Sequence, residues 1–406
     1  MKKRKLVVVG NGMAGIRTLE ELLKLDRDLY DITVFGAEPY TNYNRILLSP
    51  VLTGEQTVQD IILNDADWYR KNGITLHLNA TVTRINRARR EVVADDGTIA
   101  KYDRLLLATG SNPFILPVPG NDLKRVITFR DINDVNLMIA AASKLKRAVV
   151  IGGGLLGLEA ANGLAARGME VSVVHLGETL LNRQLDKSAA TLLQKDLERR
   201  GMRFLMNRQT ECIVGDEEGA VQAIRFTDGS ECKTDLVVMA VGIRPNTDLA
   251  QKAGIHTERG IIVNDTLQTY DPSIYAVGEC VSHRGMAYGL VAPLFEQAKV
   301  AANHLAFHGI GRYSGSALST KLKVTGIDVF SAGDFIGNAG TQSITLANAM
   351  AGIYKKLVIK DDKLIGACLY GDTADSAWYL RLIREGKSVS RQRGQLMFGE
   401  GAESQS

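Results

Sequence analysis

The stretch that decides the fold is Lys5-Leu-Val-Val-Val-Gly10-Asn-Gly12-Met-Ala-Gly15-Ile16, and its pattern returns in Ala148-Val-Val-Ile-Gly152-Gly-Gly154-Leu-Leu-Gly157-Leu158. Each copy is an apolar run followed by Gly-x-Gly-x-x-Gly. Such glycines let a pyrophosphate approach backbone amides at the start of a helix, where the helix dipole favours negative charge. One match also arises in tight structural turns, but two matches, each after an expected strand, predict two dinucleotide-binding sites. The expected contacts are Gly10, Gly12 and Gly15 in one site and Gly152, Gly154 and Gly157 in the other.

The repeat extends beyond the glycine loops. Asp96-Gly-Thr-Ile-Ala-Lys-Tyr-Asp103-Arg-Leu-Leu-Leu-Ala-Thr-Gly110 shares its frame with Asp228-Gly-Ser-Glu-Cys-Lys-Thr-Asp235-Leu-Val-Val-Met-Ala-Val-Gly242, with Asp-Gly at a hairpin turn in both. Residues 31–35 and 170–174 are typical of strands, and each follows a helical pattern, at about 13–25 and 155–167. Strand, helix and strand form a βαβ unit, which favours parallel sheets. We therefore expect an α/β protein with two doubly wound, Rossmann-like dinucleotide-binding domains.

The sequence also predicts domain boundaries. Three prolines at 113, 117 and 119 indicate a linker after the first domain, to which the chain returns after Gly242 through a helix at about 293–307. We expect a discontinuous first domain of residues 1–117 and 243–315 and a second of 118–242. A small α+β C-terminal domain of the interface type is expected at 316–395, with a hairpin from 354 to 369 turning at Asp361-Asp362 and a helix near 374–386. Residues 396–406 are expected to be a flexible tail.

Bulk composition excludes several classes of function. A net charge of +4 from 49 basic and 45 acidic residues does not favour nucleic-acid binding. No apolar stretch approaches the roughly 18 residues of a membrane helix, and the apolar run after Met1–Lys5 is too short for a signal peptide, so we expect a cytoplasmic protein that does not enter membranes. The four cysteines form no Cys-x-x-Cys and the six histidines are isolated, so we expect no metal site and no redox disulfide.

Two dinucleotides in one chain indicate a flavin paired with a nicotinamide, with the flavin carrying the redox chemistry. Glu38, soon after the second strand, is the candidate for the flavin ribose. In the second copy His175 stands where an acid is usual, which leaves the choice between NADH and NADPH open. Glu159, two residues after Gly157, either contacts the nicotinamide or complements the helix dipole.

Four motifs in order carry a family resemblance: the two glycine fingerprints, Ala108-Thr109-Gly110 and Tyr275-Ala-Val-Gly278-Glu279. The chain resembles FAD-dependent flavoproteins of the pyridine nucleotide-disulfide oxidoreductase type. More narrowly, Asn11-Gly-Met-Ala-Gly15, Leu180-Leu-Asn-Arg-Gln-Leu-Asp186, Tyr288-Gly-Leu-Val-Ala-Pro293 and Leu318-Ser-Thr-Lys-Leu-Lys-Val-Thr-Gly-Ile-Asp328 are similar to the N-terminal flavin module of the assimilatory NAD(P)H-nitrite reductase large subunit and to electron-transfer subunits of assimilatory nitrate reductases.

The resemblance implies which residues contact each cofactor. Glu159 would lie by the nicotinamide as the one catalytic candidate, and Glu279 stands where many relatives have aspartate. Ser49-Pro50 replaces the Ser-Lys pair typical of ferredoxin-type reductases. The implied FAD contacts are Gly10, Gly12, Met13, Ala14, Gly15, Glu38, Arg45, Thr109, Gly110, Arg130, Gly278, Glu279 and Pro293. The implied NAD(P)H contacts are Gly152, Gly154, Leu155, Leu156, Gly157, Glu159, His175 and Gly242.

The resemblance further implies an oxidoreductase that takes a hydride from NAD(P)H and reduces a partner redox protein, namely a molybdenum nitrate reductase, a sirohaem nitrite reductase subunit or a small iron–sulfur protein. The alternatives are a rubredoxin or ferredoxin reductase and a flavin-binding regulatory protein. The nitrite reductase large subunit continues into cysteine-rich iron–sulfur and sirohaem parts that these 406 residues lack, so we expect no nitrite reduction by this chain alone. Basic residues from Arg381 to Arg393 either steer an acidic partner or are merely solvated. The acceptor, any homo-oligomer, and whether the chain is a natural subunit or a fragment stay open.

Overall fold

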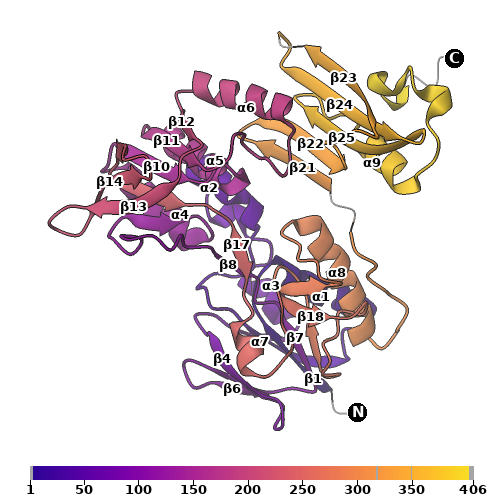
Figure 1. Cartoon of the computed structure of the whole chain (residues 1–406). Coiled ribbons are helices and arrows are strands. Elements are labelled where there is room, and N and C mark those ends of the chain that lie inside the picture. The colour runs from indigo at the N-terminus through magenta and orange to yellow at the C-terminus, as the bar shows by residue number, and fades with distance from the viewer. Residues whose placement is uncertain (1–2, 317–318, 349, 402–406) are drawn as a thin grey trace. The chain divides into compact units, whose positions relative to one another are not determined.

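The computed structural model describes residues 3–316, 319–348 and 350–401, and the chain forms two compact units (Figure 1). The first comprises Met1–Asn112 and Ile243–Ser316, and the second Pro113–Gly242 and Ala317–Ser406. Each is described by itself.

The first unit is built on a parallel five-stranded sheet in the order β19-β7-β1-β2-β3. Its strands are β1 (Arg4–Val9), β2 (Tyr30–Phe35), β3 (Ile74–His77), β7 (Arg104–Leu107) and β19 (Ile274–Ala276). An antiparallel sheet of β4 (Val82–Asn86), β5 (Glu91–Ala94) and β6 (Ile99–Lys101) contains the expected Asp-Gly turn, where Gly97 has φ +85°. The remaining elements are α1 (Met13–Leu25), η1 (Arg45–Leu47), α2 (Leu48–Thr53), η2 (Gln59–Ile61), α3 (Ala66–Lys71), β8 (Ser111–Pro113), β17 (Ile243–Pro245), α7 (Asp248–Lys252), β18 (Ile261–Val263), β20 (Val281–His283) and α8 (Val291–Leu305).

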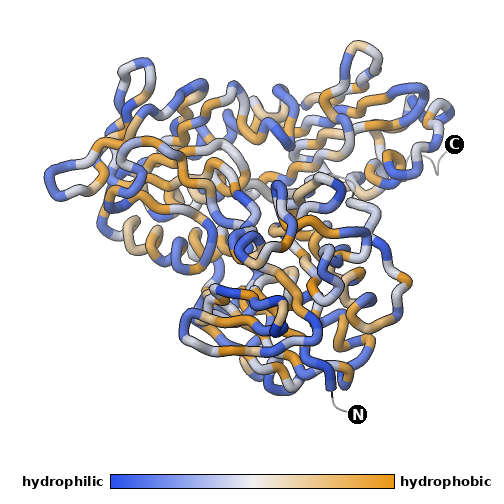
Figure 2. Tube along the Cα trace, turned by 60° about the horizontal axis from the view of Figure 1, so that its bottom comes forward, coloured by the Kyte–Doolittle hydropathy of each residue, from blue (hydrophilic) through white to orange (hydrophobic). Residues whose placement is uncertain are grey.

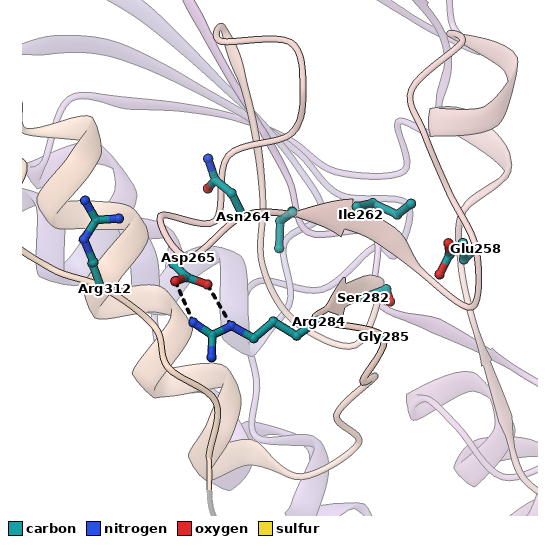
Figure 3. Close-up of a pocket in the computed structure, with 9 residues that line it drawn as sticks. Glu258, Ile262, Asn264, Asp265, Ser282, Arg284, Gly285 and Arg312 are labelled. Carbon is teal, nitrogen blue, oxygen red and sulfur yellow. Dashed lines mark hydrogen bonds and ion pairs between the residues drawn. The ribbon is translucent and has the colours of Figure 1, made fainter.

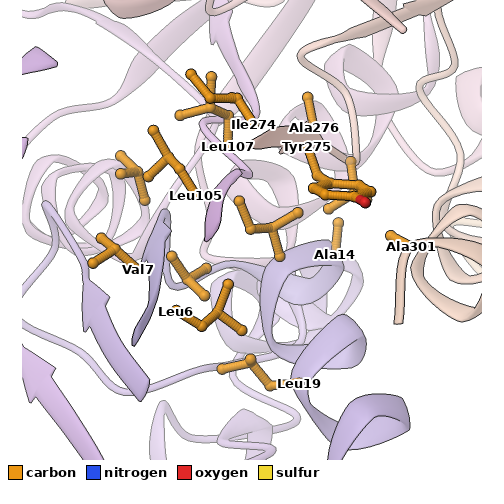
Figure 4. Close-up of a cluster of buried hydrophobic side chains, with 14 of the residues drawn as sticks. Leu6, Val7, Ala14, Leu19, Leu105, Leu107, Ile274, Tyr275, Ala276 and Ala301 are labelled. Carbon is orange, nitrogen blue, oxygen red and sulfur yellow. The ribbon is translucent and has the colours of Figure 1, made fainter. Parts of the chain in front are cut away.

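The core of this unit lies between the parallel sheet and helices α1 and α8. Leu6 and Leu105 on the sheet and Leu19 on α1 are fully buried (Figure 4). Where α1 packs on α8, the side chains of Ala14 and Ala301 are small, so the helices approach closely. This packing holds the start of α1 rigidly beside the end of β1.

The second unit repeats this sheet in the order β12-β11-β10-β16-β9. Strand β10 corresponds to β1, β11 to β2, β12 to β3 and β16 to β7, which confirms the internal repeat. The fifth strand differs in origin, because β9 precedes the repeat in the chain whereas β19 follows it. The elements are β9 (Val126–Thr128), α4 (Ile132–Ala142), β10 (Arg147–Ile151), α5 (Leu155–Ala166), β11 (Glu170–His175), α6 (Lys187–Arg199), β12 (Arg203–Met206), β13 (Thr210–Gly215), β14 (Val221–Phe226), β15 (Glu231–Lys233) and β16 (Leu236–Met239).

The C-terminal module is an antiparallel sheet in the order β21-β22-β25-β24-β23, with a helix packed on it. Asp361 and Asp362 both have positive φ at the β24–β25 turn, as the predicted hairpin requires. Leu396 and Met397 are buried in its core, so the packed chain extends past residue 395, and the expectation of a tail starting at 396 is corrected. The elements are β21 (Ser319–Val324), β22 (Ile327–Gly333), β23 (Gln342–Asn348), β24 (Ile353–Lys360), β25 (Lys363–Tyr370), α9 (Ser376–Glu385), η3 (Ser390–Gln392) and η4 (Leu396–Phe398).

This module shares the second unit because polar contacts join its sheet to the loop before α6 and to α6 itself. The Tyr354 hydroxyl donates to Asp186 Oδ2 at 2.6 Å, and Lys356 Nζ lies 3.6 Å from the same carboxylate. Tyr370 likewise donates to Asp196. Asp186 also caps α6 by accepting from the amide of Ala189 at 2.9 Å, so one carboxylate links the helix to the sheet.

Polar and apolar residues are interspersed along the trace (Figure 2). Among the residues with described structure, no helix has the length and apolar character needed to span a membrane.

Candidate dinucleotide-binding sites

The first glycine loop joins β1 to α1, and its three glycines are explained by different features of their surroundings. A Cβ on Gly10, which has φ +112°, would lie 2.1 Å from the carbonyl oxygen of Ala108, and one on Gly15 would lie 2.8 Å from the Gly10 carbonyl oxygen. Those two positions therefore exclude side chains for the sake of the fold. A Cβ on Gly12 would meet nothing within 4 Å, so Gly12 borders open space.

The second loop, between β10 and α5, repeats these relations. A Cβ on Gly152 would lie 2.2 Å from the carbonyl oxygen of Ala240, and one on Gly157 would lie 2.0 Å from that of Gly152, whereas Gly154 again faces open space. Gly242, a further expected contact of NAD(P)H, lies after β16 instead; it has φ +123°, and a Cβ there would also meet nothing within 4 Å.

Both helix starts are suited to an anion. Gly12 and Gly154 are the N-caps of α1 and α5, neither supplies a side-chain cap, and neither helix has an acid in its first turn. The first amides of each helix are thus without a side-chain acceptor and next to space that a Cβ would occupy. A pyrophosphate fits both places, because helix N-termini present donors and a positive dipole end. Met13 and Ala14 begin α1, and Leu155 and Leu156 begin α5, as expected of residues beside the phosphates.

Glu38 and Arg45, both expected at the flavin, are brought together. Glu38 follows β2 by three residues, accepts from the Tyr43 hydroxyl at 2.7 Å and pairs with Arg45, whose guanidinium lies over the Tyr43 ring. Each carboxylate oxygen keeps a second lone pair for a ribose hydroxyl. The arrangement presents a fixed carboxylate and a cation near the end of β2.

The two loops differ in which of two facing positions carries a side chain: the loop residue does so in the first copy, and the residue at the end of the second strand does so in the second copy. In the first copy a Cβ on Gly36, just after β2, would lie 2.8 Å from the Asn11 Cβ; in the second a Cβ on Gly153 would lie 2.8 Å from the His175 Cγ. Strand register pairs Val9 with Phe35 and Ile151 with Val174, so His175 is the counterpart of Gly36. His175 therefore fills the space that Asn11 fills in the first copy.

Both ring nitrogens of His175 are used by the backbone. The Gly153 amide donates to Nδ1 at 3.1 Å, so Nε2 carries the proton and donates to the Thr179 carbonyl at 3.1 Å. Burial lowers the pKa of His175, and the bond to the Thr179 carbonyl opposes that shift. The ring therefore supports the glycine loop in the place that the Asn11 side chain takes in the first copy, and the expected contact of His175 with NAD(P)H stays a prediction.

An acid near the end of β11 that the sequence reasoning did not single out is Glu178. It lies three residues beyond the end of β11, as Glu38 does beyond β2, although the register places it one residue past the counterpart of Glu38. Its side chain is largely exposed and lies 3.7 Å from Lys187 Nζ. The signal that could have found it was the repeat itself, aligned on the strand ends.

The loop after β7 is held by its neighbours. Thr109 Oγ1 donates to the Asn246 carbonyl and Ser111 Oγ donates to Glu279 Oε2, both at 2.7 Å. Gly110 and Gly278 have φ of +67° and +93°. The structure therefore groups Thr109, Gly110, Gly278 and Glu279 in the first unit, as expected of one site.

Three further residues expected to contact a cofactor, Glu159, Arg130 and Pro293, lie outside the two glycine loops. Glu159 is the fifth residue of α5 and half-buried, so it lies in the second turn, and the interpretation as a partner of the helix dipole, which acts within the first turn, is corrected. Arg130 belongs to the second unit, where its amide donates to Asp134 at 2.7 Å. Pro293 is buried in the first turn of α8.

A pocket of about 530 Å³ lies elsewhere in the first unit (Figure 3). It is lined by Ile262 and Asn264 near β18 and by Arg284 and Arg312, and none of the glycine-loop residues borders it. Arg284 donates to Asp265 and, with His283, lowers the pKa of that carboxyl to about 2. This pocket is therefore separate from the dinucleotide sites.

Two glycine loops in a duplicated parallel-sheet fold define a flavoprotein class that binds two dinucleotides, and the comparisons agree. The pyridine nucleotide-disulphide oxidoreductase family model matches residues 4–304, and the chain belongs to that family of FAD-dependent NAD(P)H oxidoreductases. Residues 319–387 match the rubredoxin NAD+ reductase C-terminal domain. Cys212, Cys232, Cys280 and Cys368 are unpaired in the structure.

Individual relatives show which members of the family the chain is similar to. The chain is 54% identical over 390 residues to a nitrite reductase (NAD(P)H) of Bacillus subtilis, covering 96% of this chain and 48% of that protein. It is 49% identical over 397 residues to the assimilatory nitrate reductase electron transfer subunit of Bacillus subtilis, covering 98% and 51%. Among solved structures, the ferredoxin reductase for the CYP199A2 system from Rhodopseudomonas palustris has a TM-score of 0.87 at 26% identity, covering 95% of this chain and 96% of that one. The chain spans about half the length of the curated relatives it matches.

Proposed function

We propose that the first unit holds FAD, that the second binds NAD(P)H, and that the chain delivers electrons from NAD(P)H to a redox protein of nitrate or nitrite reduction. The observation that carries the binding of two dinucleotides is the pair of uncapped helix starts at Gly12 and Gly154, each facing open space. The acceptor assignment rests on the high identity to nitrite and nitrate reductase proteins.

The residues of this chain bind the two dinucleotides and orient them. Amides at the start of α1 hold the FAD pyrophosphate, the Glu38 carboxylate accepts from the ribose hydroxyls, and Arg45 both neutralises that carboxylate and holds it in place. In the second unit the α5 amides hold the nicotinamide pyrophosphate on a loop fixed by His175. When bound, FAD accepts two electrons as a hydride and can release them singly.

The basic segment is less suited to steering than its sequence indicates. Lys387 lies 2.9 Å from Glu385, Arg393 lies 4.0 Å from Asp362, and Arg381 pairs with Glu400. Within the described ranges Arg384 and Arg391 have no acidic partner. We therefore propose that any electrostatic contribution to acceptor docking from this segment comes from these two residues, as a modest effect.

Paired glycine variants test the cofactor assignment. Because a Cβ at Gly12 or Gly154 meets no protein atom, Gly12→Val and Gly154→Val should both fold. We expect Gly12→Val to be purified without flavin, and Gly154→Val to keep its FAD but lose the saturable bleaching near 450 nm on anaerobic addition of NADH. Gly10→Ala, which would clash with Ala108, is the control for misfolding. Full flavin in Gly12→Val would refute the assignment of the units.

The acceptor is tested with purified partners. We expect NADH-dependent reduction of a one-electron dye and of a nitrate or nitrite reductase component. The alternative of a rubredoxin or ferredoxin reductase draws on the C-terminal domain match and on the solved ferredoxin reductase. Faster reduction of rubredoxin or ferredoxin than of the nitrogen-oxide component would favour it. A flavin that NADH does not bleach within the turnover time would favour the regulatory protein.

A further inference from the structure

The second unit has a glycine at the position where the first unit carries Glu38. Strand register makes His175 the counterpart of Gly36, so Gly177, two residues further on, is the counterpart of Glu38. A Cβ on Gly177 would lie 3.0 Å from Nε2 of His175, which is closer than most side chains approach. The imidazole ring therefore disfavours a side chain, and with it a carboxylate, at the position from which an acid usually contacts the adenosine ribose.

The segments that follow the third strands also correspond to each other. In the first unit the Ala80 amide donates to the Gly36 carbonyl at 3.0 Å. In the second unit the Arg208 amide donates to the His175 carbonyl at 3.0 Å. The residue before each is an asparagine with positive φ, of 51° in the first unit and 55° in the second. Arg208 therefore stands where the first unit has Ala80, which is buried in its core.

Arg208 places a cation beside the end of β11. It lies between β12 and β13, and the amide of the residue before it donates to the Gly177 carbonyl at 3.4 Å. Its guanidinium pairs with Asp228 at the turn between β14 and β15, and 39% of the arginine side chain and 45% of the aspartate side chain are exposed. A guanidinium has five N–H donors in a planar fork, so one carboxylate leaves donors for a second anion.

The charges at this strand end suit a phosphate. An acid that accepts from the ribose 2′-OH repels a 2′-phosphate, whereas a nearby arginine accommodates it. Glu178, one residue past the counterpart of Glu38, is largely exposed and lies 3.7 Å from Lys187 Nζ, so its charge is partly neutralised. The second unit thus combines a glycine at the usual acid position with an arginine on the neighbouring strand end.

We propose that Arg208 binds the 2′-phosphate of NADPH and so allows the second unit to use NADPH as well as NADH. Asp228 holds the guanidinium when the bound nicotinamide has no 2′-phosphate, and the phosphate competes with this carboxylate when NADPH binds. The inference rests on the proposed binding of NAD(P)H in the second unit and names a determinant of its specificity.

Steady-state dye reduction with NADH and with NADPH tests this role. We expect Arg208→Gln to lower kcat/KM for NADPH about tenfold relative to that for NADH, through KM, because a hydrogen bond to a charged group is lost. Arg208→Lys should restore part of this loss, since it keeps the charge but not the fork. Asp228→Asn should shift the ratio toward NADPH, because the anion that competes for the guanidinium is removed. The double variant should resemble Arg208→Gln alone.

Arg147→Gln is the matched control. Arg147 pairs with Asp235 at 2.7 Å and has 42% of its side chain exposed, but it is the first residue of β10. It therefore lies at the opposite edge of the parallel sheet, and its variant should leave the NADH/NADPH ratio unchanged. Melting temperature shows whether each variant is folded. Adenosine 2′,5′-bisphosphate should inhibit Arg208→Gln about tenfold more weakly than wild type, while inhibition by adenosine 5′-monophosphate should change much less.

Several results would overturn the role of Arg208. They are a wild-type chain that does not oxidise NADPH, an unchanged NADH/NADPH ratio in Arg208→Gln, an equal shift in Arg147→Gln, and a shift toward NADH in Asp228→Asn. Wild-type flavin that neither nicotinamide bleaches would refute the proposed function and this inference together. Oxidation of NADH and NADPH with a ratio insensitive to Arg208 would refute the inference alone.

Discussion

Replacement of His175 tests whether this residue supports the glycine loop or contacts the ribose and so distinguishes NADH from NADPH. The Gly153 amide donates to Nδ1 and Nε2 donates to the Thr179 carbonyl, so His175→Leu removes two hydrogen bonds. At roughly 0.5–1.5 kcal/mol each, their loss should destabilise the protein by about 1–3 kcal/mol. If about 1 kcal/mol of this is needed to restore the loop on binding, the KM for the nicotinamide rises roughly fivefold.

Two amide variants distinguish the contribution of the hydrogen bond from Gly153 from that of the hydrogen bond to Thr179. In His175→Asn the side-chain oxygen occupies the position of Nδ1 and still accepts from Gly153, so KM should stay near that of wild type. In His175→Gln the terminal amide reaches instead toward Thr179, so KM should rise as in His175→Leu. Because the ring faces the backbone, we expect the ratio of kcat/KM for NADH and NADPH to stay constant in all three variants. Steady-state kinetics with a dye acceptor, beside urea unfolding, measures both effects.

The pH dependence follows from the lowered pKa. Since the folded pKa lies below the unfolded value, the unfolded state binds more protons between the two, and stability falls as pH drops below about 6.5. A protonated Nδ1 would also oppose the Gly153 donor. The Asn variant should lose this part of the acid sensitivity. A changed NADH/NADPH ratio in His175→Leu, or an unchanged KM together with unchanged stability, would refute the role in the loop.

Three further predictions concern other residues. Glu178→Arg should lower the NADH/NADPH ratio of kcat/KM, since a carboxylate near the strand end repels a 2′-phosphate and a guanidinium attracts it; an unchanged ratio would place Glu178 away from the ribose. Arg384→Glu with Arg391→Glu should slow reduction of an acidic protein acceptor at low salt but leave reduction of a neutral dye unchanged, and equal losses would indicate a structural role. Tyr354→Phe should lower the free energy of unfolding by about 1.5–3 kcal/mol, because the lost bond has a charged acceptor in Asp186, as urea denaturation would show.

Much of the fold was predictable because its determinants are local. The loops at Gly10 and Gly152, the helix at 13–25 and the hairpin turn at Asp361 depend on glycine positions, on apolar period and on positive φ over a few residues. The repeat then doubled the evidence for each. The same reasoning located Glu38, whereas Arg45 was implied only by the family resemblance, and neither route carried information on what their side chains contact.

The sequence by itself determined the two strand, glycine loop and helix units and the class of ligand they suit, since those depend on neighbours in the chain. The tertiary structure alone decided the rest. It supplied β9 as the fifth strand from upstream of the repeat, buried Leu396 against the C-terminal sheet, and tied that sheet to Asp186 of the second unit. It also turned His175 toward Gly153, because the space there is set by the absence of a side chain 22 positions away in the chain. These features depend on packing between residues that are far apart in the chain, and a local sequence pattern carries no information about that packing.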